Sequence, residues 1–159
     1  MLNPALPTGL ARVFERLPVA PPSLAFCLAA NRLLWPVLLA RDWRSLAGRR
    51  YAIRVRDWGL SLRFRIDAQG FSPDAGQPEL AVSANARDFL LLMARREDPD
   101  TLFFSRRLLS EGDTELGLVV KNLLDGIDPD EVFARLPAPL ATLARQLLDE
   151  ATRDSAPVA

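Results

Sequence analysis

The stretch RRYAIRVRDWGLSLRFRID, residues 49–67, gives the clearest structural signal in this chain. Apolar side chains occupy every second position from Tyr51 onward and again from Leu60 onward, mostly with arginines between them. Side chains alternate between the two faces of a β-strand, so this period of two predicts two strands, each with one buried and one polar face. The residues Asp57–Gly59 predict the turn that joins them.

The polar face of these two strands carries arginines at positions 50, 54, 56, 63 and 65. Such a face either binds phosphate or nucleic acid, or is the ordinary charged surface of a sheet. The chain lacks the aromatic signature of RNA-binding domains, and its pI of 6.3 is well below that of a typical nucleic-acid-binding domain. We therefore interpret the face as charged surface and expect no nucleic-acid partner.

The rest of the chain predicts a mixture of strands and helices. Further strands are expected near Phe71 and over residues 79–86 and 107–112, and helices over residues 86–97, 98–107 and 136–154. Asp98 is a good N-cap for the second of these helices, because Pro99 fits the first helical position. This order predicts an α+β domain, an antiparallel sheet of about five strands covered by helices on one face.

Three acids at alternate positions, Glu111, Asp113 and Glu115, open the segment LLSEGDTELGLVVKNLLDG, residues 108–126. A calcium-binding loop would need glycine at its sixth position and glutamate at its twelfth, where this chain has leucine and asparagine. The apolar residues that follow recur at helical spacing, and Asp113 after Gly112 is a good N-cap. The segment therefore predicts a strand-to-helix turn, and we assign no catalytic residue.

Residues 1–42 are the most apolar part of the chain. Their prolines and the central pair Asn31 and Arg32 argue against a secretory signal and against a membrane span. The apolar spacing predicts one helix over residues 10–17 and a second, capped by Ser23 and apolar nearly all round. Such a helix packs on its own domain, dips into lipid or fills a groove of a partner.

The charges are distributed unevenly along the chain. Up to Arg56 there are nine arginines and two acids, whereas from Asp57 onward there are eleven bases and eighteen acids. This asymmetry predicts an anionic membrane surface as a contact of the basic end, although an arginine-rich solvated face would give the same count. Arginine and tryptophan side chains favour a lipid headgroup layer. The residues predicted to face a membrane or a partner are Arg32, Trp35, Arg41, Trp43 and Arg44.

The chain has no histidine and a single cysteine, Cys27. This composition excludes Ser-His-Asp and Cys-His catalysis, imidazole metal ligands, and cysteine-held zinc or iron–sulfur sites within one chain. Cys27 lies in the apolar segment SLAFCLAA, where a thiol is usually inert packing. We therefore expect no metal site and no cofactor.

The run from Ala94 to Asp128 carries three specific motifs, DPDTLFF, RRL and EGDTELGL. With these motifs the chain closely resembles the UbiT family, the accessory factors of oxygen-independent ubiquinone biosynthesis. The resemblance implies a sterol-carrier-protein-like domain whose apolar tunnel binds polyprenylated quinone precursors or phospholipid. It also implies a non-catalytic protein that presents these precursors to hydroxylases of the UbiU and UbiV type. We expect it to be cytoplasmic and peripheral at the inner membrane.

A tunnel for a polyprenyl tail needs a dry apolar lining. The residues predicted to supply it are Phe89, Leu90, Met93, Phe103, Phe104, Leu116, Val120 and Leu123, which would equally fill an ordinary core. The predicted organisation is a helical extension over residues 1–42, a lipid-binding domain over 43–150 and a flexible tail over 151–159. Two other functions stay open, a scaffold that docks biosynthetic enzymes at the membrane and a carboxylate-dependent transferase. The preferred lipid and the oligomeric state are also left open.

Overall fold

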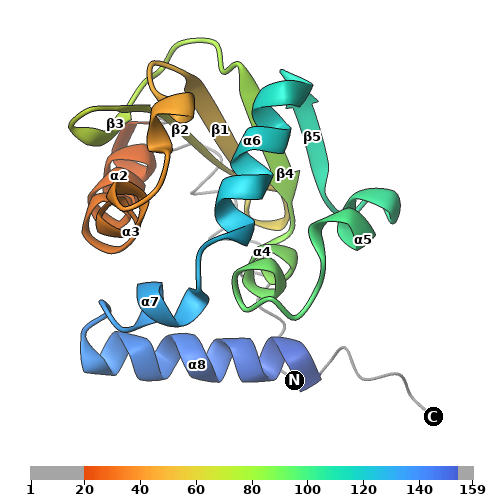
Figure 1. The fold of residues 1–159 in the computed structure, drawn as a ribbon. Coiled ribbons are helices and arrows are strands. Elements are labelled where there is room, and N and C mark those ends of the chain that lie inside the picture. The colour runs from red at the N-terminus through yellow and green to blue at the C-terminus, as the bar shows by residue number, and fades with distance from the viewer. Residues whose placement is uncertain (1–19, 154–159) are drawn as a thin grey trace.

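The computed structural model describes residues 20–153. The predicted helix over residues 10–17 lies outside this part of the chain, as does most of the predicted tail. A five-stranded sheet forms the upper layer, and helices lie beneath it (Figure 1). The strands are β1 (Arg50–Val55), β2 (Leu60–Asp67), β3 (Gly70–Pro73), β4 (Leu80–Ala84) and β5 (Leu109–Gly112).

The sheet has the strand order β3-β2-β1-β4-β5, with one parallel pair, β1 with β4, among antiparallel pairs. The predicted α+β class with about five strands is confirmed, but the sheet is not wholly antiparallel. The register gives the reason, because Pro73 at the end of β3 lies opposite Phe64, which lies opposite Tyr51 near the start of β1. Residues 74–79 therefore need only cross sideways, so β4 starts beside Tyr51 and runs in the direction of β1.

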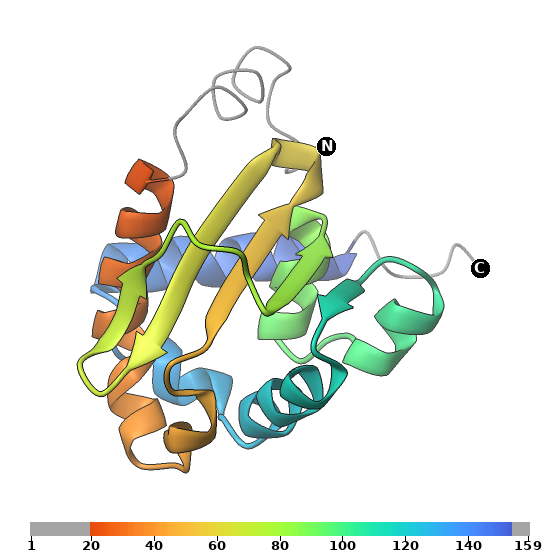
Figure 2. The same cartoon turned by 90° about the horizontal axis from the view of Figure 1, so that it is seen from above.

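The helices lie on one side of the sheet or along its β3 edge. Seen from above, the near face of the sheet is covered by none of the helices in the described part of the chain (Figure 2). The longer helices are α2 (Ala20–Leu33), α4 (Ala86–Met93), α6 (Thr114–Asp125) and α8 (Ala138–Arg153). The shorter ones are α3 (Trp35–Leu39), α5 (Pro99–Phe104), α7 (Pro129–Phe133) and the 3-10 helices η1 (Trp43–Leu46) and η2 (Arg56–Trp58).

The core lies between the sheet and the helices. Tyr51 and Phe64 pair across β1 and β2, and their rings stack with centroids 5.5 Å apart. The core cluster also contains Cys27, Ala30, Val37, Leu38, Leu46, Ile66, Phe71, Leu80, Leu116 and Ile127. Burial raises the pKa of the Cys27 thiol to about 11, so the thiol stays protonated at neutral pH, as expected of a packing residue. Helices α2 and α3 share this core with the sheet. The predicted boundary at residue 42 between a helical extension and a lipid-binding domain stays a prediction.

Helix α2 uses polar side chains to satisfy the β3 side of the sheet. The Asn31 amide donates to the Phe71 carbonyl at 2.8 Å and accepts from the Phe71 N–H at 2.7 Å. Ser23 Oγ accepts from the Arg63 N–H at 2.9 Å, in the part of β2 that β3 does not reach. The prediction that Ser23 caps a helix was wrong, because Ser23 lies inside α2, which is helical from Ala20 onward, and is buried against the sheet.

Helix α6 begins as its sequence predicts. Gly112 has φ +104°, a conformation that glycine adopts readily. The Asp113 carboxylate then accepts from the Leu116 N–H at 3.0 Å, which is the geometry of an N-cap. Leu116 is buried, and Val119, Val120 and Leu123 pack against the core behind it. The acids that looked like a site are thus a helix start.

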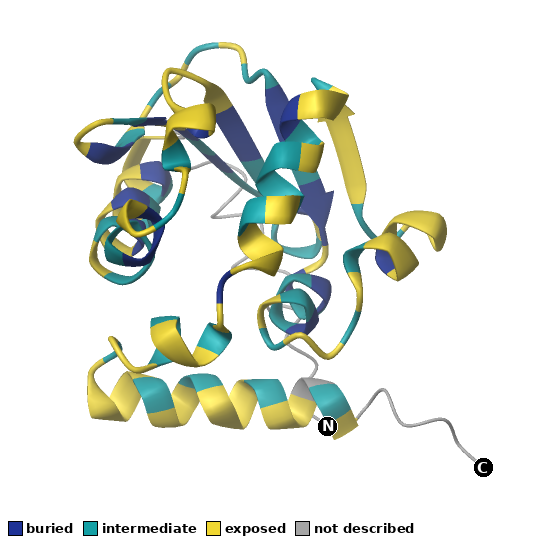
Figure 3. Ribbon diagram, viewed as in Figure 1, coloured by how far each residue is buried: buried dark blue, intermediate teal, exposed yellow. Residues whose placement is uncertain are grey.

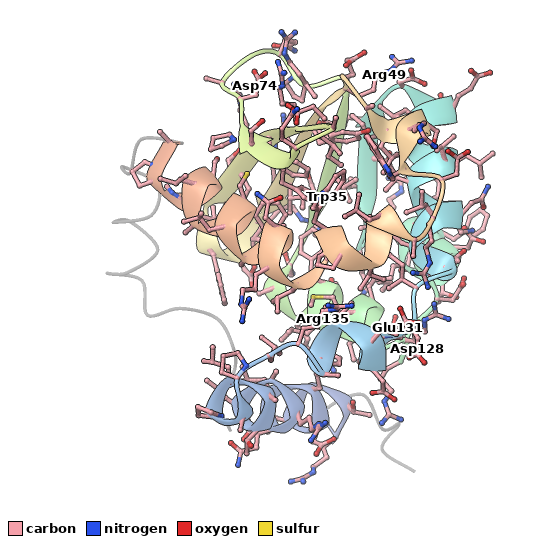
Figure 4. The ribbon with its side chains drawn as sticks, turned by 60° about the vertical axis from the view of Figure 1, so that its left-hand side comes forward. Trp35, Arg49, Asp74, Asp128, Glu131 and Arg135 are labelled. Atoms are coloured by element: carbon pink, nitrogen blue, oxygen red, sulfur yellow. The ribbon has the colours of Figure 1, made fainter. Side chains whose placement is uncertain are left out.

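The arginines of the uncovered sheet face pair with nearby acids or donate to backbone carbonyls. Arg50 Nε lies 3.3 Å from Asp74 Oδ2, and Arg54 Nη1 lies 2.6 Å from Glu111 Oε2. Asp74 and Arg49 both lie at one end of the sheet (Figure 4). This pairing agrees with the interpretation of the face as charged surface.

The last part of the described chain lies below the main body and is the most exposed. Helix α7 was not predicted, although Asp128 caps it as Asp98 caps α5, and each is followed by proline. Helix α8 was predicted and is present, but none of its described residues is buried (Figure 3). Its leucines Leu140 and Leu143 are about half exposed.

Candidate functional site

A groove of about 540 Å³ lies between η1 and α6. We call it the η1–α6 groove, and its lining residues are Arg41, Asp42, Ser45, Val119, Asn122, Leu123 and Gly126. It is a shallow, open depression of the surface rather than an enclosed cavity. The groove has an apolar wall and a polar rim, an arrangement that suits an amphiphile.

The apolar wall comes from the buried stripe of α6. Val119 and Leu123 are one helical turn apart, so they lie on the same face of the helix. Both are half-buried and pack against the core cluster. Asn122 lies between them in sequence and is exposed, which places its amide at the rim.

The opposite wall is fixed by the start of the sheet. Leu46 at the end of η1 is buried, and its carbonyl accepts from the Tyr51 hydroxyl at 3.0 Å. The Gly48 N–H donates to the Ile66 carbonyl at 2.8 Å and ties the same segment to β2. The Ser45 hydroxyl is exposed at the rim and donates to the Asp42 carbonyl at 3.1 Å.

Arg41 joins the two walls. Its guanidinium donates to the Val37 carbonyl in α3 and to the Gly126 carbonyl at the end of α6, both at 2.9 Å. It also lies 3.5 Å from a carboxylate oxygen of Glu131 in α7. Figure 4 shows Glu131 beside Asp128 on α7, below the main body. Arg41 is therefore the side chain that crosses the end of the groove.

A second arginine holds the same end of α6. Arg95 donates to the Leu124 carbonyl at 3.5 Å, to the Asp125 carbonyl at 2.5 Å and to the Ile127 carbonyl. The carboxyl end of a helix carries partial negative charge, so cationic side chains stabilise it. Arg95 has φ +52°, which is unusual for a residue other than glycine.

The eight residues predicted to line a lipid tunnel lie on three helices. On α6, Leu116 is in the core, and Val120 and Leu123 pack against it. On α4, Phe89 and Leu90 are half-buried, whereas Met93 is 54% exposed. On α5, Phe103 and Phe104 are exposed, Phe104 to 84%. Of the eight, Leu123 lines the groove, and the set as a lipid site stays a prediction.

The five residues predicted to face a membrane or a partner also differ in their environment. Trp35 and Trp43 are half-buried, with ring centroids 5.0 Å apart, and Trp35 also packs edge-on against Phe71 (Figure 4). Arg44 lies over the Trp43 ring at 5.9 Å. Arg32 is exposed on α2, and Arg41 crosses the groove. The outward apolar side chains of this region are instead Leu24, Leu28 and Leu39, exposed to 50%, 64% and 53%.

Acidic side chains do not gather into a metal site in the part of the chain that the structure describes. Among residues 20–153, no group of three or more His, Cys, Asp or Glu side chains is arranged to hold an ion. Glu111 pairs with Arg54, and Asp113 caps α6. In the same range no helix is both long and apolar enough to cross a bilayer.

The sequence of the sheet and of the helices beside the groove matches a known family. The sequence model described as the SCP-2 sterol transfer family matches residues 36–125, more than half of the chain. The chain belongs to the SCP-2 sterol transfer family. The matched range contains the whole sheet, η1 and α6, and therefore both walls of the η1–α6 groove. Helices α2, α7 and α8 lie outside it.

Among the curated members of known role, the chain is similar to the ubiquinone biosynthesis accessory factor UbiT of Escherichia coli K12. The two sequences are 42% identical over 118 residues. The match covers 70% of this chain and 64% of the relative's own length. The resemblance to the UbiT family that residues 94–128 predict is thereby confirmed.

Several solved structures are similar to this chain at low sequence identity. One is described as the UbiJ-SCP2 ubiquinone synthesis protein, with 21% identity, a TM-score of 0.43, and coverage of 74% of this chain and 88% of the other. Another is sterol carrier protein domain 2 of Helicoverpa armigera, with 15% identity, a TM-score of 0.47, and coverage of 66% and 89%.

Sequence reasoning missed most of the groove. Val119 belongs to the same helical stripe as Leu116 and Leu123, so the helical period itself was a signal for it. Arg41 and Gly126 are 85 positions apart, and local sequence holds no signal for a bond between them. Ser45 and Asn122 are single polar residues that only the fold brings together.

Proposed function

We propose that this protein is a non-catalytic lipid-binding accessory factor in oxygen-independent ubiquinone biosynthesis. It binds polyprenylated quinone precursors between the sheet and the helices. The observation that carries the proposal is the 42% identity to the UbiT accessory factor over 118 residues, together with the match of residues 36–125 to the SCP-2 family. The groove beside α6 supports it, because Val119 and Leu123 line the groove and also pack against the core.

A polyprenyl tail needs an apolar environment but few directed contacts. Burial of apolar surface contributes roughly 25 cal/mol per Å², so a long tail provides most of the affinity and a few polar groups orient the head. Helix α6 provides the apolar stripe, with Val120 and Leu123 beside the core and Asn122 at the rim. Phe89 and Leu90 on α4 provide further half-buried apolar surface.

The environment of the acids supports a carrier rather than an enzyme. Asp113 caps α6, and the Glu111 carboxylate is on the uncovered face of the sheet beside Arg54. A general acid or base needs to reach a substrate held in a cleft. Neither residue lines the η1–α6 groove.

The proposed partners are hydroxylases of the UbiU and UbiV type, which would receive the bound precursor from this protein. We place the protein in the cytoplasm, at the periphery of the inner membrane, because its lipid cargo is made for that membrane. The partners and the location go beyond the sequence similarity to UbiT, because the match covers 64% of that protein's length.

The test is native mass spectrometry of the full chain purified from cells that grow without oxygen. The expected result is a bound species whose mass, after release, is that of a prenylated quinone precursor or a phospholipid. A protein that carries neither, from cells that contain both, would contradict the proposal. The control is an unrelated protein of similar size purified in parallel, which reports lipid carried over by the procedure.

A second function, docking to a membrane or to partner enzymes, is favoured by the outward face of α2. Leu24 and Leu28 are one turn apart and both at least half exposed, with Leu39 beyond them in α3. Deletion of residues 1–42 would remove Cys27, Val37 and Leu38 from the core and is therefore a poor test.

The sharper test is the double substitution Leu24→Ser and Leu28→Ser. The control is Leu118→Ser, which removes an exposed leucine of α6. Flotation with vesicles of phosphatidylethanolamine and phosphatidylglycerol measures membrane binding, and a pull-down with the hydroxylases measures docking. Loss of either interaction in the α2 variant, but not in the control, supports this function. Unchanged behaviour in both assays would count against it.

A further inference from the structure

We propose that the η1–α6 groove is the opening through which the tail of a single-chain lipid enters the core, and that Arg41 holds this opening closed. The proposal deepens the proposed function and rests on it, because it assumes that the chain binds lipid. It assigns a place of entry and a residue that controls exchange.

The first argument is the continuity of apolar surface from the groove to the core. Val119 and Leu123 line the groove and also pack against the core cluster. Leu116, one turn before Val119 on the same stripe, is only 4% exposed. A tail that slides along this stripe exchanges contact with water for contact with the core at every step.

The second argument is the polar rim, which fits a small head that accepts hydrogen bonds. Asn122 and Ser45 are exposed on opposite sides of the groove. The Asn122 amide carries a donor, whereas the Ser45 hydroxyl donates to the Asp42 carbonyl and keeps its acceptor capacity. The Arg41 guanidinium adds positive charge at one end. Asp42 also lines the rim and offsets this charge, so the ligand class is a long apolar tail with a small polar head that accepts hydrogen bonds, one molecule per groove.

The third argument is that the two ends of α6 are held differently. At its start, the Asp113 N–H donates to the Glu79 carbonyl at 2.8 Å, a backbone bond to the segment before β4. At its end, the side chains of Arg41 and Arg95 bond the last carbonyls. Long side chains change rotamer more readily than paired backbone moves, so the end of α6 beside Arg41 is where the groove widens.

A second concave surface of the described chain does not suit a lipid tail. A cavity of about 230 Å³ lies where the end of α4 meets α7 and α8. Charged side chains make up half of its lining, Arg96, Asp130, Arg145 and Asp149. Desolvating such groups against a hydrocarbon tail is unfavourable.

The experiment measures binding of cis-parinaric acid, a fluorescent long-chain fatty acid, to the full chain. Ser45→Trp and Asn122→Trp place a bulky ring at the rim, and both positions are exposed, so the fold tolerates them. The control is Leu118→Trp, which lies on α6 outside the groove and is 58% exposed. We expect the two rim variants to bind at least about tenfold more weakly or more slowly than wild type, and the control to match wild type.

Arg41→Gln removes the charge that joins α3, α6 and α7, and Arg44→Gln is its matched control on η1. We expect release of the probe, chased with unlabelled oleate, to be about threefold faster or more in Arg41→Gln and unchanged in Arg44→Gln. Circular dichroism and urea unfolding of each variant confirm the fold.

The outcomes separate the two proposals. If the wild-type chain binds no probe, lipid binding fails and the proposed entry fails with it. If wild type binds but the rim variants bind as the Leu118→Trp control does, the groove is not the entry, while lipid binding stands. Equal release from Arg41→Gln and Arg44→Gln overturns the role of Arg41.

Discussion

The two edges of the sheet are finished in different ways. At the β3 edge, Asn31 of α2 pairs with both backbone groups of Phe71, and Ser23 takes up the Arg63 N–H. At the β5 edge, all four strand residues are exposed, as the yellow strand in Figure 3 shows. Unpaired strand edges attract other strands, and proteins usually cover or shorten them. Both edge strands of this sheet are four residues long, but only the β3 edge is also covered by a helix in the described part of the chain.

The difference explains why an apolar helix carries polar residues. Asn31 looks misplaced in the helical pattern of α2, but it lies where a backbone edge needs a donor and an acceptor. The β5 side is instead supported by ion pairs. Arg107 Nε bonds Asp88 at 3.0 Å, and Arg107 Nη1 lies 2.9 Å from Glu97, next to the start of β5.

The largest expected effect is at the end of β5. In Gly112→Ala, the new Cβ would lie 2.1 Å from the Glu79 carbonyl oxygen, and φ is +104°. We expect the free energy of unfolding to fall by about 3–4 kcal/mol, measured by urea denaturation. Gly48→Ala is the matched control, because φ there is +75° and its Cβ would meet nothing within 4 Å. Equal losses in the two variants would show that backbone conformation, not the contact, decides the cost.

The next largest effect on the free energy of unfolding is expected at the ion pair between Arg107 and Asp88, beside β5. Arg107→Met leaves the Asp88 carboxylate, whose side chain is 6% exposed, without its charged partner. We expect a loss of about 3 kcal/mol in the free energy of unfolding, because a buried unpaired charge is strongly destabilising. Arg106→Met, at the exposed neighbouring position, is the control. A loss below about 1 kcal/mol in Arg107→Met would mean that water reaches Asp88 and replaces the arginine.

The covered edge gives a smaller effect. Asn31→Leu leaves the Phe71 N–H and carbonyl without their protein partner, and we expect a loss of about 2 kcal/mol in unfolding free energy. Hydrogen exchange at the Phe71 amide should accelerate in parallel. Asn122→Leu, at an exposed position of α6, should leave the free energy of unfolding unchanged. Unchanged exchange at Phe71 would show that Asn31 does not protect this edge.

Low pH should weaken the contact between the start of β1 and Glu79, the residue before β4. Hydrogen bonds from Arg49 and from the Arg50 N–H lower the pKa of Glu79 below its usual value of 4.5. A lowered pKa in the folded state contributes stability that is present above the unfolded pKa and is lost as pH falls through the folded one. Unfolding between pH 6 and pH 3 should therefore show a shallower decline in Glu79→Gln than in wild type. Parallel curves would assign the acid sensitivity to other carboxylates.

The smallest effect on the free energy of unfolding is expected at Phe104 of α5, on the β5 side of the sheet. Phe104 is 84% exposed, so Phe104→Ser should change the unfolding free energy by less than about 0.5 kcal/mol. Leu102→Ser, two residues earlier and fully buried, should destabilise the protein severely in the same assay. A large loss in Phe104→Ser would place this ring in the core instead of on the surface.

Local patterns predicted much of this fold. The alternation in β1 and β2, the Asp98 and Asp113 caps and the α6 stripe are present as the sequence indicates. Helix α7 was missed although Asp128 and Pro129 repeat the signal that located α5. Ser23 was misplaced because a helix start and a buried contact with a strand use the same residue type.

The candidate site was less accessible to such reasoning. Leu123 was predicted to line a lipid site and lines the groove, whereas Trp35 and Trp43 are half-buried against each other and the core, and their membrane or partner contact stays a prediction. An apolar residue in a helical stripe is equally suited to a core, a ligand site or a surface patch, and only its neighbours distinguish these roles. The buried face of α2 carries Ser23, Cys27 and Ala30, which are no more apolar than the exposed Leu24 and Leu28, so the apolar pattern of that helix did not show which face is buried.

By itself, the sequence determined the strand hairpin, the capped helices, the lack of histidine chemistry and the likeness to UbiT, because each depends on residues close in the chain or on shared motifs. The tertiary structure alone decided that α2 covers the β3 edge and that β1 and β4 run parallel. It also decided that Arg41 and Gly126 meet across a groove. These features join segments far apart in sequence, and their energies come from geometry that no local pattern records.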